Sequence, residues 1–350
     1  MKFEPELLKF ADGRAVTGAE WPKRRNELIK ILSEQLYGFS PEAPKEVCGR
    51  ILSEQPNCCA GHATLQEIEI SWQGEKGACS FPMHLFVPRA DAPVPLVLLI
   101  NFRKDAYDMY FPAEEIIDNG FALGVIYYND ITTDNADFTT GIAAMYERNS
   151  VVSWGKIGMW AFGMSRALDY LCTRPEFDIN RIAAIGHSRL GKTALWCAAQ
   201  DERVTYAGSN DSGCCGAALE KTRHEGGETL DRITTVFPFW FREDVRKNAG
   251  HEAEMPYDQH FLLAACAPRC VMVGSASLDF WADQYSEQLA CVAASPAWEL
   301  LGKTGYAGPE APAKVGDDFS RGCIGYHLRD GVHFLSRADW LSYMDFMKNH

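Results

Sequence analysis

The chain has 350 residues, of which 47% are hydrophobic and 23% charged, and its formal net charge is −13. This length and apolar content allow a large buried core, and we predict a single domain over residues 1–350 with residues 1–60 as an N-terminal extension packed on it. The acidic charge argues against nucleic acid or an anionic membrane surface as a partner, because both favour clustered Lys and Arg.

The first residues do not indicate export, and the cysteines do not indicate a metal site. Residues 1–9 lack the apolar run of a signal peptide, and no segment approaches the roughly 20 apolar residues of a membrane span. The twelve cysteines are scattered without zinc-type spacing, so we expect reduced thiols and neither a metal nor a cofactor. The sequence as written predicts a cytoplasmic protein, or a secreted or periplasmic one if a leader has been removed.

The predicted elements alternate as in an α/β protein. In chain order they are a helix over residues 20–38, strands over 65–70, 80–87, 95–100 and 121–127, a helix over 154–171, and strands over 181–185, 204–210, 269–274 and 324–328. Residues 65–70 and 80–87 alternate like a half-buried hairpin, whereas the two following strands are continuous apolar runs, as central parallel strands require. This order predicts an α/β-hydrolase fold, a three-layer sandwich with helices on both faces of a mostly parallel central sheet.

Residues 186–193, Gly-His-Ser-Arg-Leu-Gly-Lys-Thr, fit two different kinds of site. As G-x-x-x-x-G-K-[ST] they match the phosphate-binding P-loop. As a strand, a tight turn at Ser188 and a helix, they match the nucleophile elbow of an α/β-hydrolase. Because both motifs need a strand before and a helix after, the local sequence does not choose between them.

The rest of the chain favours the hydrolase. A P-loop usually follows the first strand of its domain, but at least four strand-like segments come before the strand that leads into Ser188. A hydrolase needs an acid and then a histidine after the serine, each behind a late strand. Asp279 follows the strand over 269–274, and His333 follows the strand over 324–328. The order Ser188, Asp279, His333 is the hydrolase order.

Several blocks resemble the glucuronoyl esterase family. The elbow, in which Ser188 is followed by Arg189 and then by Gly191-Lys192, is similar to the family's elbow. The other similar blocks are Trp160 with Ser165–Tyr170, Asn210–Ala218, Gly227–Thr229 with Phe237–Phe241, Ser277–Asp283 and the segment around His333. Fungal members pair two cysteines beside the catalytic histidine, and His187 and Phe334 stand at those places, so the chain resembles the bacterial type.

The resemblance implies hydrolysis of the ester between the C6 carboxyl of (4-O-methyl)glucuronic acid on xylan and an alcohol, in plants a lignin alcohol. Glucuronoxylan fragments are the expected partners, and no protein partner is expected. Ser188 would attack the carbonyl and His333 would accept its proton. The Arg189 N–H and guanidinium would form the oxyanion hole.

The resemblance also implies a sugar pocket. It places Lys192 near the sugar hydroxyls, Trp281 against the ring, and Glu228 and Arg223 in the same pocket. Each has a plainer interpretation: Lys192 as a solvated helix residue, Trp281 as core, and Arg223 paired with Glu228 on a loop. The segment Asn101–Asp105 departs from the Gly-Asn-His run of many relatives.

Two carboxylates compete for His333. Asp211 stands where fungal members have the glutamate of the triad, and Asp279 stands where many bacterial members have their acid. We favour Asp279 and keep Asp211 as an alternative or auxiliary acid, because Asp211 is one methylene shorter than glutamate. Asp279 has a competing interpretation as the N-cap of the helix that follows it.

Three other functions remain open at this point. The nearest is an acetylxylan or general carboxylesterase of the same fold. The second is a P-loop NTPase that uses Gly186–Thr193, and the third is a non-catalytic sugar-binding relative. Arg189, Lys192 and Trp281 favour the uronate ester over an acetyl ester, since acetyl removal has no evident need of that set.

Overall fold

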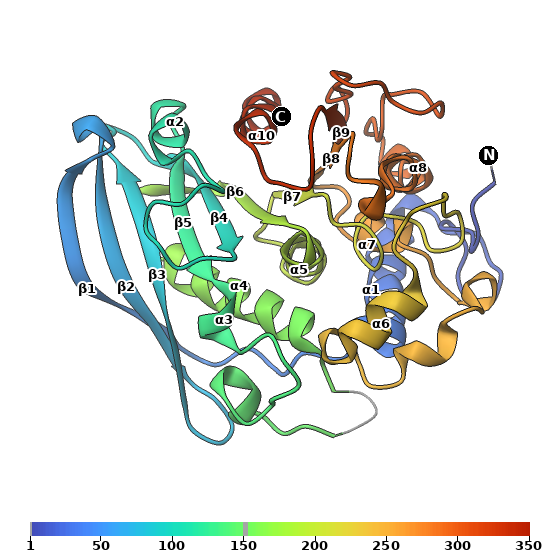
Figure 1. The fold of residues 1–350 in the computed structure, drawn as a ribbon, viewed down its shortest axis with the longest axis horizontal. Helices are drawn as coiled ribbons and strands as arrows, with labels where there is room; N and C mark the ends of the chain where they lie inside the picture. Colours follow the sequence, from blue (N-terminus) through green and yellow to red (C-terminus); the bar gives the residue numbers. More distant parts are fainter. Residues whose placement is uncertain (1, 150–152) are drawn as a thin grey trace.

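A computed structural model describes residues 2–149 and 153–350, which contain one nine-stranded sheet in the order β1-β2-β3-β5-β4-β6-β7-β8-β9 (Figure 1). The strands are β1 Val47–Cys58, β2 Ala63–Gln73, β3 Ala78–Pro88, β4 Val94–Asn101, β5 Ala122–Tyr127, β6 Phe177–His187, β7 Tyr206–Asn210, β8 Cys270–Ala276 and β9 Ile324–Arg329. From β5 to β9 neighbouring strands run parallel, whereas β1, β2 and β3 join the sheet antiparallel. The predicted α/β-hydrolase architecture is confirmed.

The antiparallel end of the sheet confirms the predicted hairpin and corrects the extension. Leu65 pairs with Phe86 across β2 and β3. However, β1 lies within the segment that we assigned to an extension over residues 1–60, and it pairs with β2 as the edge strand. Its side chains are mostly exposed, so it lacks the apolar alternation that identifies a half-buried strand. The N-terminal extension therefore ends before Val47.

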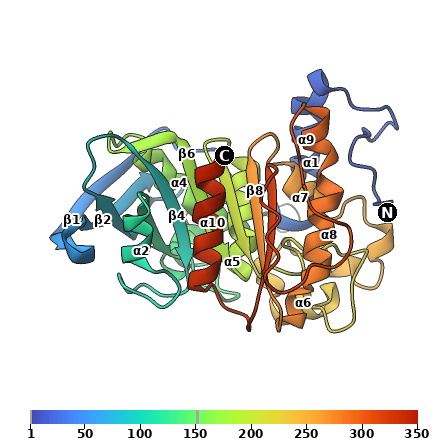
Figure 2. The same cartoon turned by 90° about the horizontal axis from the view of Figure 1, so that it is seen from above.

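Helices cover both faces of the sheet, with α2 and α10 on one side and α4 and α5 on the other (Figures 1 and 2). The helices are α1 Trp21–Leu32, α2 Ala113–Asp118, α3 Tyr128–Ile131, α4 Lys156–Leu171, α5 Arg189–Gln200, α6 Leu230–Val236, α7 His260–Ala264, α8 Gln284–Ala294, α9 Pro296–Leu300 and α10 Arg337–Asn349. The helix predicted over residues 20–38 is α1, continued by a π-helical turn over Ser33–Tyr37. No helix within the described residues has the length and apolar character needed to cross a membrane.

Strand β4 shows why the central strands read as continuous apolar runs. Leu96 and Leu98 belong to the core beneath α4 and α5, whereas Val97 and Leu99 belong to the core beneath α2 and α10. Because successive side chains of a strand point to opposite faces, a strand covered on both faces has no polar positions.

The carboxyl ends of β6, β7, β8 and β9 meet at one edge of the sheet. His187 pairs with Asn210, Asn210 pairs with Gly274, and Gly274 pairs with His327. Each of the loops that follow these strands therefore begins at the same edge, which is where open α/β sheets place their ligands.

Candidate active site

Ser188 occupies the sharp turn between β6 and α5. Its backbone has φ 58° and ψ −128°, outside the helical and strand regions, and its N–H donates to the Asn210 carbonyl at 2.8 Å. The turn requires glycine at position 186, because a Cβ there would lie 2.0 Å from the Leu190 carbonyl oxygen. This strained strand-turn-helix is the nucleophile elbow that the sequence predicts.

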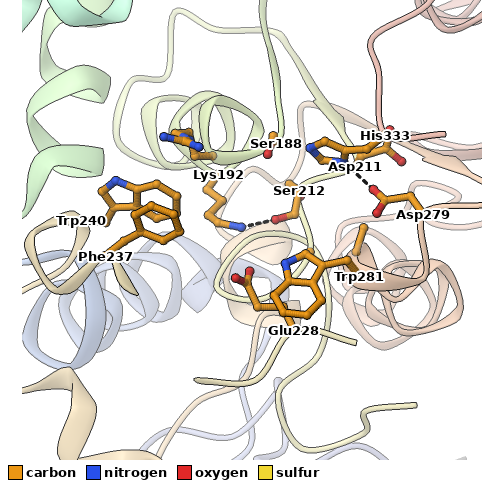
Figure 3. A pocket seen from close by; sticks show the side chains of 13 residues that line it. Ser188, Lys192, Asp211, Ser212, Glu228, Phe237, Trp240, Asp279, Trp281 and His333 are labelled. Atoms are coloured by element: carbon orange, nitrogen blue, oxygen red, sulfur yellow. Dashed lines mark hydrogen bonds and ion pairs between the residues drawn. The ribbon is translucent and has the colours of Figure 1, made fainter. Parts of the chain in front are cut away.

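His333 lies between Ser188 and Asp279 at the rim of the same cavity (Figure 3). Its Nδ1 is 2.5 Å from Asp279 Oδ2, and the Asp279 side chain is buried while the imidazole is 43% exposed. Asp279 makes no capping hydrogen bond; Asp283 instead caps α8 by accepting from the Ser286 N–H. The structure thus pairs Asp279 with His333 and leaves the Nε2 side of the ring for Ser188.

Asp211 lies close to this pair but is engaged elsewhere. Its Oδ1 accepts the Ala276 N–H at 2.7 Å, and its Oδ2 is 3.4 Å from the Arg329 guanidinium. Burial, together with the carboxylates of Glu287 and Asp279, raises the pKa of Asp211 well above its usual value. No hydrogen bond between Asp211 and His333 occurs in the described part of the chain, so Asp279 and not Asp211 is the carboxylate bound to the imidazole, and an auxiliary role of Asp211 stays a prediction.

Arg189 is held beside the nucleophile by an aromatic cage and one carboxylate. Its guanidinium lies 4.5 Å from the Trp240 ring centroid and 5.3 Å from that of Phe237. It forms an ion pair with Asp134, which also accepts the Trp240 indole N–H at 2.7 Å. The Arg189 N–H opens α5 and so has no acceptor within the helix. The guanidinium is thereby held in the cavity that Ser188 also lines, and its part in an oxyanion hole stays a prediction.

Asp134→Asn is expected to lower kcat by about tenfold with little change in KM. The amide keeps the size of the side chain but removes the charge that fixes Arg189, and loss of a whole oxyanion donor costs about 10²- to 10³-fold. Steady-state kinetics on an ester substrate measure the effect, and Arg189→Ala gives its upper limit. Asp137→Asn in the same loop, where the carboxylate accepts from the Thr139 N–H and hydroxyl and makes no ion pair with Arg189, is the matched control. Equal kcat in the two variants would contradict a role for the Asp134 charge.

A cavity of about 430 Å³ extends from Ser188 between two aromatic walls. Trp281, 49% exposed, forms one wall, and the stacked rings of Phe237 and Trp240, with centroids 3.8 Å apart, form the other. Trp281 is therefore a surface platform, and its interpretation as core is wrong.

Lys192 and Glu228 lie between these walls (Figure 3). Lys192 is only 3% exposed, so its interpretation as a solvated helix residue is wrong, and its Nζ donates to the Ser212 carbonyl. Burial raises the pKa of Glu228, and the nearby charges of Lys192 and Arg189 oppose that rise. The cavity thus combines a flat aromatic face with a charged donor and an acceptor, which suits the C–H face and hydroxyl rim of a pyranose.

Arg223 does not line the cavity. Its guanidinium donates to the main-chain carbonyl of Glu228 at 3.1 Å and pairs with the Glu252 carboxylate at 3.3 Å. It supports the Glu228 loop from behind, so its assignment as a substrate contact is wrong. Sequence reasoning missed Asp134, whose loop position gave no signal. The aromatic block Phe237–Phe241 did carry one, because clustered aromatics outside a helix or strand often line sites.

His187 and Phe334 pack as an aromatic cluster where fungal members have their cysteine pair. The His187 ring lies 4.4 Å from the His333 ring, and its Nδ1 is 2.6 Å from Asn210 Oδ1. Phe334 packs on Tyr110 with centroids 4.9 Å apart. Burial and the neighbouring His333 lower the pKa of His187 to about 3, which keeps it neutral. Packing of neutral rings thus borders His333 on this side.

Two groups of side chains within the described ranges have ligand atoms close enough for a metal ion. One is Asp211, Asp279 and His333, where the histidine and Asp279 already bind each other. The other is Cys214, Cys215 and Glu220, where Glu220 accepts the Cys215 N–H and the Cys214 thiol. Both groups are satisfied by internal hydrogen bonds, and the expectation of no metal stays a prediction.

The fold and this site define a serine hydrolase of the α/β-hydrolase type. A family model described as fungal glucuronyl esterase matches residues 68–302. A carbohydrate esterase from an unknown prokaryotic organism is 33% identical to this chain, and the alignment covers 99% of this chain and 89% of the length of that esterase. The 4-O-methyl-glucuronoyl methylesterase 1 of Wolfiporia cocos is 28% identical over 87% of this chain and 73% of its own.

Solved structures agree with these relatives. A promiscuous CE15 esterase from a marine bacterial metagenome superposes with a TM-score of 0.90 at 32% identity, over 100% of this chain and 97% of its own. The glucuronoyl esterase of Solibacter usitatus gives a TM-score of 0.90 at 31% identity, and the superposition covers 100% of this chain and 98% of that structure. The chain belongs to the glucuronoyl esterase family. The P-loop alternative is therefore wrong.

Proposed function

We propose that this protein hydrolyses esters of (4-O-methyl)glucuronic acid, such as those that join glucuronoxylan to lignin alcohols. The observation that carries the proposal is the combination in one cavity of Ser188, His333 and Arg189 with Lys192, Glu228 and Trp281. The first three residues supply ester hydrolysis, and the last three supply contacts to a sugar. Curated relatives are 4-O-methyl-glucuronoyl methylesterases, which supports the choice of sugar.

The chemistry proceeds through an acyl-enzyme. Ser188 Oγ attacks the C6 carbonyl while His333 accepts its proton, and Asp279 stabilises the resulting imidazolium. The Arg189 N–H and guanidinium stabilise the negative charge that develops on the carbonyl oxygen. His333 then protonates the departing alcohol, and a water activated by the same imidazole releases the uronic acid. The imidazole of His333 is 43% exposed, so the alcohol that it protonates is released to solvent.

Parallel assays separate this activity from its nearest alternative. Hydrolysis of benzyl glucuronate and methyl glucuronate is measured beside p-nitrophenyl acetate and acetylated xylan. The proposal expects the highest kcat/KM on the glucuronate esters. Higher kcat/KM on both acetyl substrates would instead identify an acetylxylan or general carboxylesterase. The assay includes these substrates because one structural relative is described as a promiscuous esterase.

Lys192→Met is expected to raise KM for benzyl glucuronate by about 10- to 100-fold, the range for loss of a hydrogen bond to a charged group. Methionine keeps the buried apolar stem and removes the ammonium. KM for p-nitrophenyl acetate, which has no sugar, should stay unchanged. Lys30→Met on the exposed face of α1 is the matched control. An equal rise of KM on both substrates would contradict a sugar contact.

A further inference from the structure

The loop that carries His333 is wrapped around one buried arginine side chain. Arg329, the last residue of β9, donates through Nη1 to the Asp330 carbonyl at 3.0 Å. Its Nη2 donates to the Val332 carbonyl at 3.1 Å and to the Phe334 carbonyl. These last two carbonyls belong to the residues on either side of His333. A single guanidinium therefore fixes the main chain directly before and after the catalytic imidazole.

Arg329 is itself fixed from two other elements. Its Nε donates to Asp339 Oδ2 at 2.6 Å, and its Nη2 lies 3.4 Å from Asp211 Oδ2. The Arg329 side chain is 9% exposed and both carboxylates are fully buried. His327 and Ser336 also bind Asp339. The planar fork of arginine suits this arrangement, because it offers five donors in fixed directions and keeps its charge when buried.

The same loop is joined to the loop of the triad acid. The Ser277 N–H donates to the Arg329 carbonyl and the Leu278 N–H to the Gly331 carbonyl, each at 2.9 Å. The Ser277 hydroxyl donates to Asp330 Oδ1 at 2.8 Å. Asp279 follows immediately, so displacement of the His333 loop also displaces the partner of the imidazole. The segments 277–279 and 330–334 form one unit with Arg329 at its centre.

We propose that Arg329 is a positioning residue for the reaction, holding His333 in register with Ser188 and Asp279, and that Asp339 with Asp211 serves to orient Arg329. This assigns to Asp211 a place in the site other than that of a triad acid. The inference rests on the proposed ester hydrolysis only through Ser188 and His333, and not on the identity of the sugar.

Arg329→Lys is expected to lower kcat on benzyl glucuronate by about 100-fold with KM unchanged, since a displacement of about 1 Å in a reacting group can cost this much. Lysine keeps the charge beside Asp339 but cannot reach three carbonyls in a plane. Lys192 and Glu228 stand on segments outside this unit, so their contacts to the substrate are retained. The rate of Ser188 labelling by a fluorophosphonate, which needs the His333 base but no sugar, should fall by the same factor.

Arg269→Lys is the matched control for lost stability. Arg269 donates to the carbonyls of Asp201, Val204 and Ala265, and it lies at the opposite end of β8, about 20 Å from the site along the strand. Thermal unfolding of both variants is measured, and kinetics are compared well below the lower Tm. Unchanged labelling in Arg329→Lys, or an equal fall in Arg269→Lys, would overturn the inference. If the parent enzyme showed no preference for glucuronate esters while Ser188 labelling still depended on Arg329, only the proposed substrate would be overturned.

Discussion

Ser188→Ala is expected to lower kcat for glucuronate esters by roughly 10⁶-fold while the fold is retained, because the nucleophile of a triad acts as a unit with its base. Only a hydroxyl is lost, and the backbone of the elbow is set by Gly186 and by the Ser188 N–H to the Asn210 carbonyl, neither of which changes. The affinity for a glucuronate ester should persist, since the sugar contacts are intact. kcat on benzyl glucuronate and ester affinity by calorimetry give the two readouts.

The control for Ser188→Ala is Ser80→Ala, which removes a hydroxyl from an exposed position of β3. Circular dichroism and thermal unfolding should match the parent for both variants. Near-native turnover in Ser188→Ala with a native spectrum would show that another group attacks the ester.

Asp279→Asn is expected to lower kcat by up to about 10⁴-fold, because an amide leaves the imidazole in the wrong tautomer. The hydrogen bond of 2.5 Å between His333 Nδ1 and Asp279 Oδ2 is the reason to assign the effect to this residue. KM should change little, since Asp279 is buried behind the histidine. kcat is measured on benzyl glucuronate, and fluorophosphonate labelling of Ser188 should slow in parallel.

Asp211→Asn is the comparison that decides between the two acids. It should lower kcat far less than Asp279→Asn, because Asp211 binds the Ala276 N–H and contacts Arg329. The double variant should fall well below either single variant if Asp211 can substitute for Asp279. A severe loss in Asp211→Asn with little effect in Asp279→Asn would make this a fungal-type triad with aspartate in place of glutamate.

The sequence was sufficient for features that depend on local chain chemistry. The apolar runs of β4 and β5 identify strands covered on both faces. Residues 186–193 fit both a P-loop and an elbow, and the acid and the histidine that follow in hydrolase order favour the elbow. The chain order of Ser188, Asp279 and His333 then fixes their common edge, because carboxyl ends of parallel strands meet. Strand β1 escaped prediction for the opposite reason: its exposed side chains follow no apolar pattern, and only pairing with β2 makes it a strand.

The tertiary structure alone decided which side chains bind one another. Asp279 and Asp211 are both aspartates, and they follow the neighbouring strands β8 and β7. Only the positions of their carboxylates show that Asp279 binds His333 and that Asp211 accepts the Ala276 N–H. The hydrogen bond between Arg223 and the Glu228 carbonyl lies within a loop that has no periodic sequence pattern. The ion pair between Asp134 and Arg189 joins two segments that are far apart in the chain. A sequence determines a strand or a turn through contacts within a few residues, whereas hydrogen-bond partners across loops depend on the final position of every element between them.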